Sequence, residues 1–255
     1  MIRIVCCFLA LVASGISLWP QPAEAGEYLK KQLRYPRVRA AEKRYVDDVK
    51  ADFRKAGAQW PPAGVFLRAF KGEGLIELWA APRRGRSWVK VRDFEICMAS
   101  GVLGPKVQSG DMQVPEGFYH VDRFNPASRF HLSLGLNYPN AVDRTRSGRR
   151  PPGGDIFIHG DCVTIGCMPL EDGPMSYLYV AAVHSRDAGQ RRLPVHVFPC
   201  RMDQPLCKGL RSMAESEDDS LRAFWDTLEV GYAAFEASKV PPVVRATARG
   251  YQIRE

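Results

Sequence analysis

Residues 156–167 read IFIHGDCVTIGC, and this is the most informative stretch of the chain. Its apolar start predicts a short strand that carries His159 at its end, and a glycine-punctuated turn leads to Cys167, eight residues later. A thiol needs a neighbouring base to be a strong nucleophile at neutral pH, and an imidazole within hydrogen-bond reach can take its proton. The stretch therefore predicts Cys167 as a nucleophile, with His159 as its general base and acid.

Two glycines and a threonine shape the turn between the histidine and the cysteine. Gly160 and Gly166 permit unusual backbone dihedrals and a close approach of the backbone. The amides around Gly166 and Cys167 are therefore candidates to face a developing oxyanion. Thr164 either steadies the turn or helps to orient His159, and a threonine that only caps a tight turn fits equally well.

The cysteine count leaves one thiol without an internal partner. Beyond residue 25 the cysteines are Cys97, Cys162, Cys167, Cys200 and Cys207. In an oxidising compartment thiols tend to pair, and because five is odd, at least one stays free, binds a ligand or links to another chain. A local Cys200–Cys207 disulfide fits their short loop. Cys162 pairs with Cys97, stays a buried thiol, or protects Cys167 by a reversible disulfide, and a purely structural role for all of them stays open. The spacings do not match the Cys-x2-Cys pairs of structural zinc sites, so we expect no metal and no cofactor.

The period of the apolar residues changes along the chain from helical to β-like and back. Residues 37–55 carry apolar side chains at spacings of three and four, which predicts an amphipathic helix. Turns that contain glycine and proline then separate short β-prone runs. These runs are 65–70, 75–80, 87–99, 117–121, 130–136, 156–158 and 193–198. We therefore expect a mostly β core with flanking helices, of the α+β class.

Other segments complete the expected architecture. Residues 143–154 are rich in Arg, Gly and Pro without periodicity, which predicts an exposed, mobile basic loop. Residues 175–182 predict a short helix, and residues 215–239 predict a longer one that Pro241-Pro242 ends. The expected division is a signal peptide at 1–25, an N-terminal helical segment at 26–62, a catalytic domain at 63–200 and a C-terminal helical extension at 201–255.

The beginning of the chain has the pattern of a targeting segment. Arg3 precedes an uncharged apolar run from Ile4 to Leu18, and Ala23-Glu24-Ala25 matches a small-x-small cleavage site. About 15 apolar residues fall short of the roughly 20 that span a bilayer, so a membrane anchor is the weaker interpretation. We expect export to the periplasm, cleavage near Gly26, and no stable membrane insertion afterwards.

The chain is basic, with a formal net charge of +8 at pH 7. Removal of residues 1–25 takes away Arg3 and Glu24 and leaves that charge unchanged. Outside the cytoplasm the nearest polyanions are cell-wall polymers and lipid head groups, so we do not expect nucleic acid as a partner. A non-catalytic wall-binding module is an alternative that rests on the charge alone.

His159-Gly160 followed by Thr164-x-Gly166-Cys167 resembles the signature of the L,D-transpeptidase catalytic domain, of the YkuD type. Residues 110–119, which read GDMQVPEGFY, resemble that family's Pro-x-Gly segment at the start of a strand. Residues 134–140 (LGLNYPN) and 193–199 (LPVHVFP) resemble its YafK-like branch. The resemblance covers roughly residues 65–199. It implies a β-rich catalytic core with helices at both ends.

The resemblance also implies two-step acyl transfer on peptidoglycan stem peptides. Cys167 attacks the carbonyl on the L-centre of diaminopimelate, an amine leaves, and a thioester remains. An acceptor amine, from a wall-linked lipoprotein or a D-amino acid, then forms a new amide, which is L,D-transpeptidase activity. With water as acceptor the same acyl-enzyme gives a hydrolase, either an L,D-carboxypeptidase or an amidase that releases wall-linked lipoprotein.

Departures from the family pattern concern substrate binding. Many members carry Arg two residues beyond the cysteine, where this chain has Pro169, and His in place of Ile165. An arginine of residues 143–154 is a candidate to bind the substrate carboxylate instead. Tyr138 and Asn140 follow a predicted strand and are candidates to line the cleft and bind substrate, although they also fit an ordinary turn.

Overall fold

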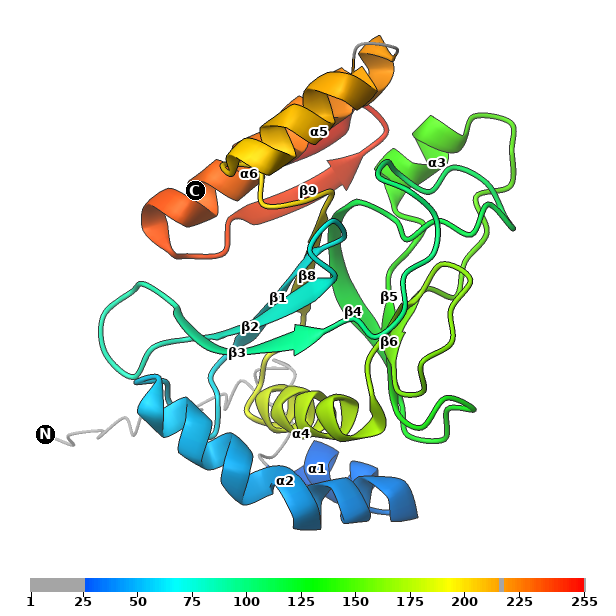
Figure 1. Cartoon of the computed structure of the whole chain (residues 1–255). Coiled ribbons are helices and arrows are strands. Elements are labelled where there is room, and N and C mark those ends of the chain that lie inside the picture. Colours follow the sequence, from blue (N-terminus) through cyan, green and yellow to red (C-terminus); the bar gives the residue numbers. More distant parts are fainter. Residues whose placement is uncertain (1–25, 216–217, 255) are drawn as a thin grey trace, which may run out of the picture.

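An eight-stranded mixed sheet forms the centre of the molecule in the computed structural model, which describes residues 26–215 and 218–254 (Figure 1). The strand order is β3-β2-β1-β8-β4-β5-β6-β7, with β1–β8 and β6–β7 parallel and the other neighbours antiparallel. The strands are β1 (Val65–Phe70), β2 (Leu75–Ala80), β3 (Val89–Glu95), β4 (Gly117–Asn125), β5 (Ser133–Leu136), β6 (Phe157–His159), β7 (Met168–Pro169) and β8 (Leu193–Phe198). The expected signal peptide at 1–25 lies outside the described residues. In the part of the chain that is described, no helix could span a membrane.

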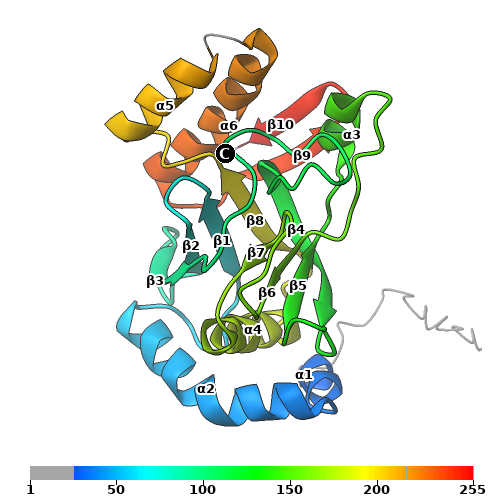
Figure 2. The same cartoon turned by 45° about the vertical axis from the view of Figure 1, so that its right-hand side comes forward.

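Helices cover the sheet on both sides (Figures 1 and 2). On one side lie α1 (Glu27–Gln32), α2 (Pro36–Lys55) and α4 (Asp172–Asp187). On the other lie α5 (Pro205–Glu215), α6 (Asp219–Ser238) and a hairpin of β9 (Val243–Thr247) and β10 (Gly250–Arg254). This arrangement confirms the expected α+β fold, mostly β at its core with helices at both ends.

Helix α4 lies between the sheet and α2, and residues 175–185 within it are all buried. A helix that is buried on every side has no polar face, so its apolar residues show no one-sided period. For that reason the sequence predicted only residues 175–182 of a helix that extends over Asp172–Asp187.

Two expectations of local structure were wrong. The stretch 143–154 is not loop throughout, because α3 (Ala141–Ser147) occupies its first part. Asn140 caps this helix by accepting hydrogen bonds from the amides of Val142 and Asp143, while the Asp143 carboxylate accepts one from the Asn140 amide. The extension at 201–255 is not wholly helical either, because the β9–β10 hairpin follows α6 and packs against it.

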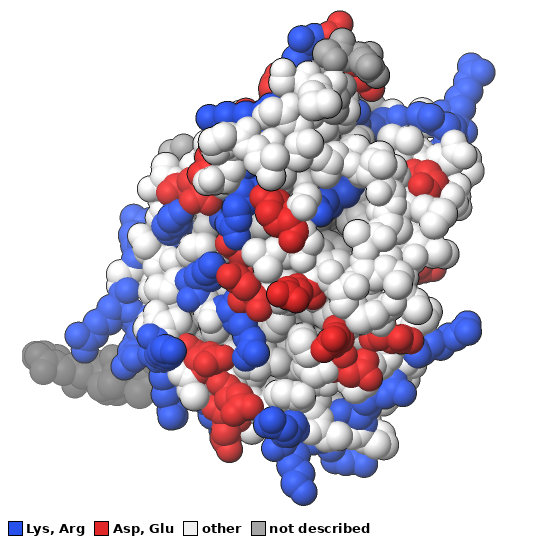
Figure 3. Space-filling model, in the orientation of Figure 1, with Lys and Arg blue, Asp and Glu red and all other residues white. Residues whose placement is uncertain are grey.

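Charged side chains are interspersed on the face of the molecule that Figure 3 shows, with Asp and Glu among Lys and Arg. Exposed ion pairs of the protein include Arg44 with Asp48 and Lys90 with Asp93. Such pairs contribute little to stability in water. On this face the positive net charge is spread out and does not form a continuous basic surface.

Candidate active site

The register of two short parallel strands brings the cysteine and the histidine to the same face of the sheet. Ile158 of β6 lies opposite Met168 of β7, and both side chains are buried. Because side chains alternate along a strand, His159 and Cys167 project to the other face. The Phe157 amide lies 3.4 Å from the Cys167 sulfur and donates to it. Residues eight apart in sequence thus become neighbours in one cleft.

The cleft around the sulfur has a volume of about 710 Å³. Both His159 and Cys167 line it, together with Thr164. Most of its remaining wall is apolar, formed by Met98, Phe130, Phe157, Val163 and Ile165. The polar and charged side chains in the wall are Asn125, Ser128, Arg129, Ser133 and Asp155. The cleft therefore combines one thiol, one imidazole and a largely apolar surface.

The His159 ring is oriented by the backbone next to it. Nδ1 lies 2.6 Å from the Gly160 carbonyl oxygen, and since that oxygen can only accept, Nδ1 carries the proton. Nε2 then holds the lone pair of the neutral ring and is the basic nitrogen. The Phe130 ring packs against the imidazole with 4.9 Å between centroids. Burial lowers the pKa of His159, while the Gly160 carbonyl and the Asp161 charge oppose that shift.

The Cys167 thiol is neutral in this resting geometry. Burial raises the pKa of Cys167, the Asp155 carboxylate raises it further, and the hydrogen bond from Phe157 acts against both. Within the described residues, no hydrogen bond joins Cys167 to His159, and the thiol points instead toward the Asp155 carbonyl at 3.6 Å. A raised thiol pKa and a lowered imidazole pKa both favour the uncharged pair over a thiolate–imidazolium pair.

We expect the pH dependence of Cys167 alkylation by iodoacetamide to show the raised pKa of this thiol directly. A raised pKa means that the thiolate fraction grows only at alkaline pH, so the rate midpoint should lie above the value of about 8.5 of an ordinary thiol. The Asp155→Asn variant removes one cause of the shift and should lower that midpoint. A wild-type midpoint near neutral pH would instead indicate a preformed ion pair.

Thr164 holds the turn that ends at Cys167. Its Oγ1 accepts from the amides of Gly166 (3.1 Å) and Cys167 (2.8 Å), and its hydroxyl donates to the Cys167 carbonyl at 2.9 Å. Of its two expected roles the contacts match the steadying of the turn, since none of them reaches His159. These same amides were the expected oxyanion donors, and here they are already hydrogen-bonded to Thr164.

The two glycines of the turn occupy positions where a side chain would collide. A Cβ at Gly166, whose φ is +132°, would lie 2.9 Å from the Gln113 carbonyl oxygen. A Cβ at Gly160 would lie 2.6 Å from an Asp172 carboxylate oxygen and 2.7 Å from the His131 Cβ. Both glycines therefore let the turn between His159 and Cys167 pack closely against neighbouring segments.

The Thr164→Val variant should destabilise the turn. It removes the acceptor of two amides at nearly constant side-chain volume, and each unpaired, partly buried amide costs about 1–3 kcal/mol. We expect a thermal midpoint several degrees lower, measured by calorimetry. Thr227→Val on the exposed face of α6 is the matched control, because its hydroxyl only donates to the Ala223 carbonyl of its own helix. Equal midpoints for the two variants would contradict the role of Thr164.

The disulfides leave one free thiol in the described chain. Cys97 pairs with Cys162, and Cys200 pairs with Cys207, so Cys167 is the free cysteine. The first bond ties the segment after β3 to the turn between His159 and Cys167, and the Cys97 amide also donates to the Pro169 carbonyl at 3.1 Å. Three outcomes were expected for Cys162, and the structure shows the disulfide with Cys97.

The structure does not bring Tyr138 and Asn140 to the cleft. The Tyr138 hydroxyl is buried and donates to the Pro152 carbonyl at 3.0 Å, whereas Asn140 caps α3. Both line a separate cavity of about 1000 Å³ beside the β9 hairpin. Their expected place in the cleft was wrong, because the chain turns away from β6 after β5, and Asn140 serves as a helix cap.

The arginines of residues 143–154 do not line the cleft either. Arg144 lines the cavity beside the hairpin, and Arg146 lies over the Phe224 ring, 4.3 Å from its centroid. The arginine in the cleft wall is Arg129, in the loop between β4 and β5. The sequence carried no signal for it, because this loop reaches the cleft only through the pairing of β5 with β6.

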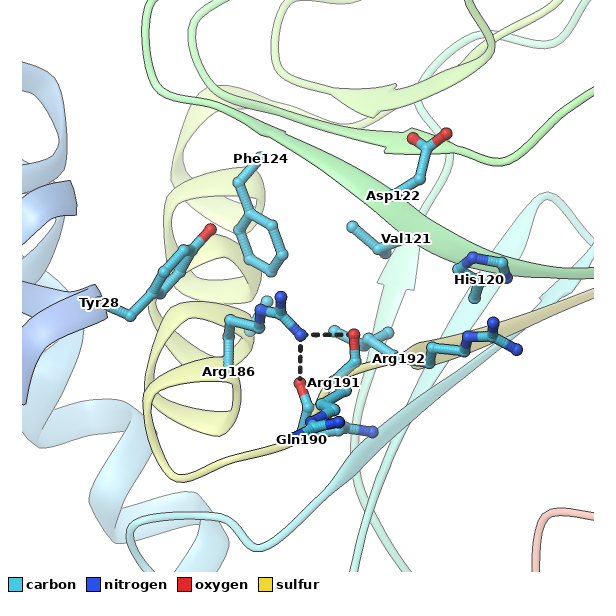
Figure 4. Close-up of a pocket in the computed structure, with 11 residues that line it drawn as sticks. Tyr28, His120, Val121, Asp122, Phe124, Arg186, Gln190, Arg191 and Arg192 are labelled. Carbon is cyan, nitrogen blue, oxygen red and sulfur yellow. Dashed lines mark hydrogen bonds between the residues drawn. The ribbon is translucent and has the colours of Figure 1, made fainter. Parts of the chain in front are cut away.

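A third cavity, of about 420 Å³, lies near the end of α4, and Arg186, Arg191 and Arg192 are among the residues that line it (Figure 4). Arg186 donates there to the carbonyls of Gln190 and Arg191, and its guanidinium lies 5.8 Å from the Tyr28 ring centroid. This cavity shares no lining residue with the cleft around Cys167. Its arginines therefore stand apart from the candidate active site.

The fold and the cleft together define a protein with a mostly β core, in which the free, half-buried Cys167 of the described chain lines the same cleft as an oriented histidine. No family model matches the chain. A curated relative, named "Putative L,D-transpeptidase YafK" in Escherichia coli (strain K12) and again in Escherichia coli O157:H7, is 31% identical over 191 residues. The match covers 74% of this chain and 73% of the relative. The chain therefore belongs to the YafK-like L,D-transpeptidase family.

Solved structures of lower similarity were also found. The helical cell shape determining protein Pgp2 from Campylobacter jejuni is 15% identical, with a TM-score of 0.42 over 77% of this chain and 79% of that chain. Bd1075 from Bdellovibrio bacteriovorus is 15% identical, with a TM-score of 0.39 over 72% of this chain and 81% of that chain.

Proposed function

We propose that this protein is an exported cysteine acyltransferase that acts as a peptidoglycan L,D-transpeptidase on stem peptides. The observation that carries the proposal is one cleft that holds both the free Cys167 thiol and the unoccupied basic nitrogen of His159. Family membership supports peptidoglycan as the substrate. A wall-binding module without activity would have no use for an oriented imidazole beside a free thiol.

The proposed reaction begins when His159 Nε2 takes the thiol proton. The Cys167 sulfur then attacks the carbonyl on the L-centre of diaminopimelate, and a C–S bond forms as the C–N bond breaks. The imidazolium returns its proton to the leaving amine. Because burial lowers the pKa of His159, the imidazolium is a stronger acid than free histidine and protonates the leaving amine readily.

The second half-reaction resolves the thioester. An acceptor amine gives a proton to His159 and attacks the acyl carbon, so that a C–N bond forms as the C–S bond breaks. The imidazolium then returns the proton to the departing sulfur, which regenerates the thiol. Water in place of the amine gives hydrolysis through the same intermediate. Family membership supports transfer to an amine as the first choice.

Incubation with defined muropeptides and mass spectrometry tests both halves of the proposal. Cross-linked dimers, or D-amino acid exchange products, are expected for a transpeptidase. Freed amine partners without new amides would indicate the hydrolase. Failure of a carbapenem to acylate Cys167, seen as an unchanged intact mass, would contradict the nucleophile itself.

We also propose that the chain is exported and cleaved near Gly26. The Gly26 amide, next to the predicted cleavage site, donates to the Asp187 carboxylate of α4 at 2.8 Å, so this residue is tied to the folded core. The two disulfides suit an oxidising compartment. The proposal is tested by the N-terminal sequence of the protein from a periplasmic extract, where a start at Met1 would contradict it. We further propose that residues 63–200 form the catalytic domain, flanked by the segments 26–62 and 201–255.

A further inference from the structure

The loop that joins β4 to β5, residues 126–132, supplies one side of the catalytic cleft. It places Phe130 against the His159 ring and Arg129 in the cleft wall. The Arg129 side chain is exposed, and it makes no hydrogen bond or ion pair with any described residue. A cation without a partner in a largely apolar cleft is available to a ligand.

This loop is held in place from both ends. Arg37 of α2 reaches across from the N-terminal layer and donates through one nitrogen to the Ser128 carbonyl, at 2.6 Å, and to the His131 carbonyl. The His131 ring is itself 2.7 Å from the Ser176 hydroxyl of α4. Because Arg129 lies between the two tethered carbonyls, its backbone position is set before any ligand binds.

The charges around the cleft decide what kind of group Arg129 can bind. Among the charged residues that line the described cleft, Arg129 is the cation and Asp155 the carboxylate. Asp155 is already paired with Arg123, 2.7 Å away. An anionic ligand group therefore meets an Arg129 that has no partner among the described residues, while Asp155 is engaged by Arg123. A guanidinium favours a planar carboxylate, to which it can donate two parallel hydrogen bonds.

We propose that Arg129 binds a carboxylate of the stem peptide and so determines which peptide lies at Cys167, with Arg37 as the positioning residue for its loop. This inference rests on the proposed function for the identity of the ligand. It does not depend on turnover, because peptide binding can be measured in a protein that lacks the nucleophile.

The first test measures binding of the tetrapeptide L-Ala-γ-D-Glu-meso-diaminopimelate-D-Ala by calorimetry in a Cys167→Ala background. Adding Arg129→Ala should weaken binding by about 10- to 100-fold, the loss typical of a charge-assisted pair, and Arg129→Lys should restore part of it. Carboxamide analogues of the peptide, each amidated at one carboxylate, identify the group. For one of these carboxamides, the loss of affinity caused by Arg129→Ala should disappear.

The second test separates positioning from general stability. Arg37→Ala should weaken binding of the free-acid peptide but leave binding of that one carboxamide unchanged. Arg39→Ala is the matched control, since Arg39 donates only to the Leu33 and Arg34 carbonyls near its own helix, and it should bind both peptides like the parent.

Several results would overturn the inference. They are an unchanged affinity in Arg129→Ala, an equal penalty for every carboxamide, or no binding of the tetrapeptide at all. The proposed function fails by a different observation, namely a Cys167 that is never acylated. The two failures are therefore distinguishable.

Discussion

Replacement of Cys167 by serine should reduce muropeptide turnover by at least about 10³-fold. A serine hydroxyl is far less acidic than a thiol, and the lowered pKa of His159 makes the imidazole a weak base for it. The oxygen ester that serine would form in place of the thioester is therefore not expected to form at a useful rate. Turnover is measured by chromatography of the muropeptides, and the acyl adduct by intact mass.

The control for this variant is its own stability. Serine is only slightly smaller than cysteine, and the four other described cysteines stay in their disulfides. The thermal midpoint of the variant should therefore match that of the parent. A Cys167→Ser protein that is folded and as fast as the parent would refute the nucleophile. A variant that is slow only because it is unfolded would be recognised by the lost thermal transition.

Replacement of His159 by alanine should give the second largest loss, about 10²- to 10⁴-fold in turnover. Without the imidazole nothing in the described cleft can take the thiol proton near neutral pH, because the Asp155 carboxylate is paired with Arg123. The loss should be largest near neutral pH. The parent itself should keep its activity below pH 6.5. Burial lowers the pKa of His159 below the ordinary histidine value of about 6.5, so the imidazole stays neutral and basic at that pH.

Alkylation separates a lost base from a damaged site. At a pH well above the thiol pKa, Cys167 is ionised without help, so iodoacetamide should modify His159→Ala as fast as the parent. His120→Ala is the matched histidine control, because His120 is half-buried on β4 outside the cleft and should leave turnover unchanged. Slow alkylation of His159→Ala at high pH would mean that the substitution had closed the cleft.

Local patterns were enough to predict most of the core. The strands at 65–70, 75–80 and 193–198 coincide with β1, β2 and β8, because short β-prone runs between glycine and proline turns leave little choice of period. The boundaries of β3 and β5 were less accurate, since their ends depend on where the neighbouring strand stops. The β9–β10 hairpin was missed, as its two strands are short and partly exposed.

The sequence by itself was enough to predict that Cys167 and His159 share one cleft, since they lie within one strand–turn–strand unit whose geometry is local. It also determined the mostly β class. Only the tertiary structure decided the partner of Cys162, the placement of Tyr138 and Asn140 away from the cleft, and the presence of Arg129 within it. Those outcomes depend on contacts between distant segments, such as Arg37 with Ser128, 91 residues apart, and no local periodicity encodes them.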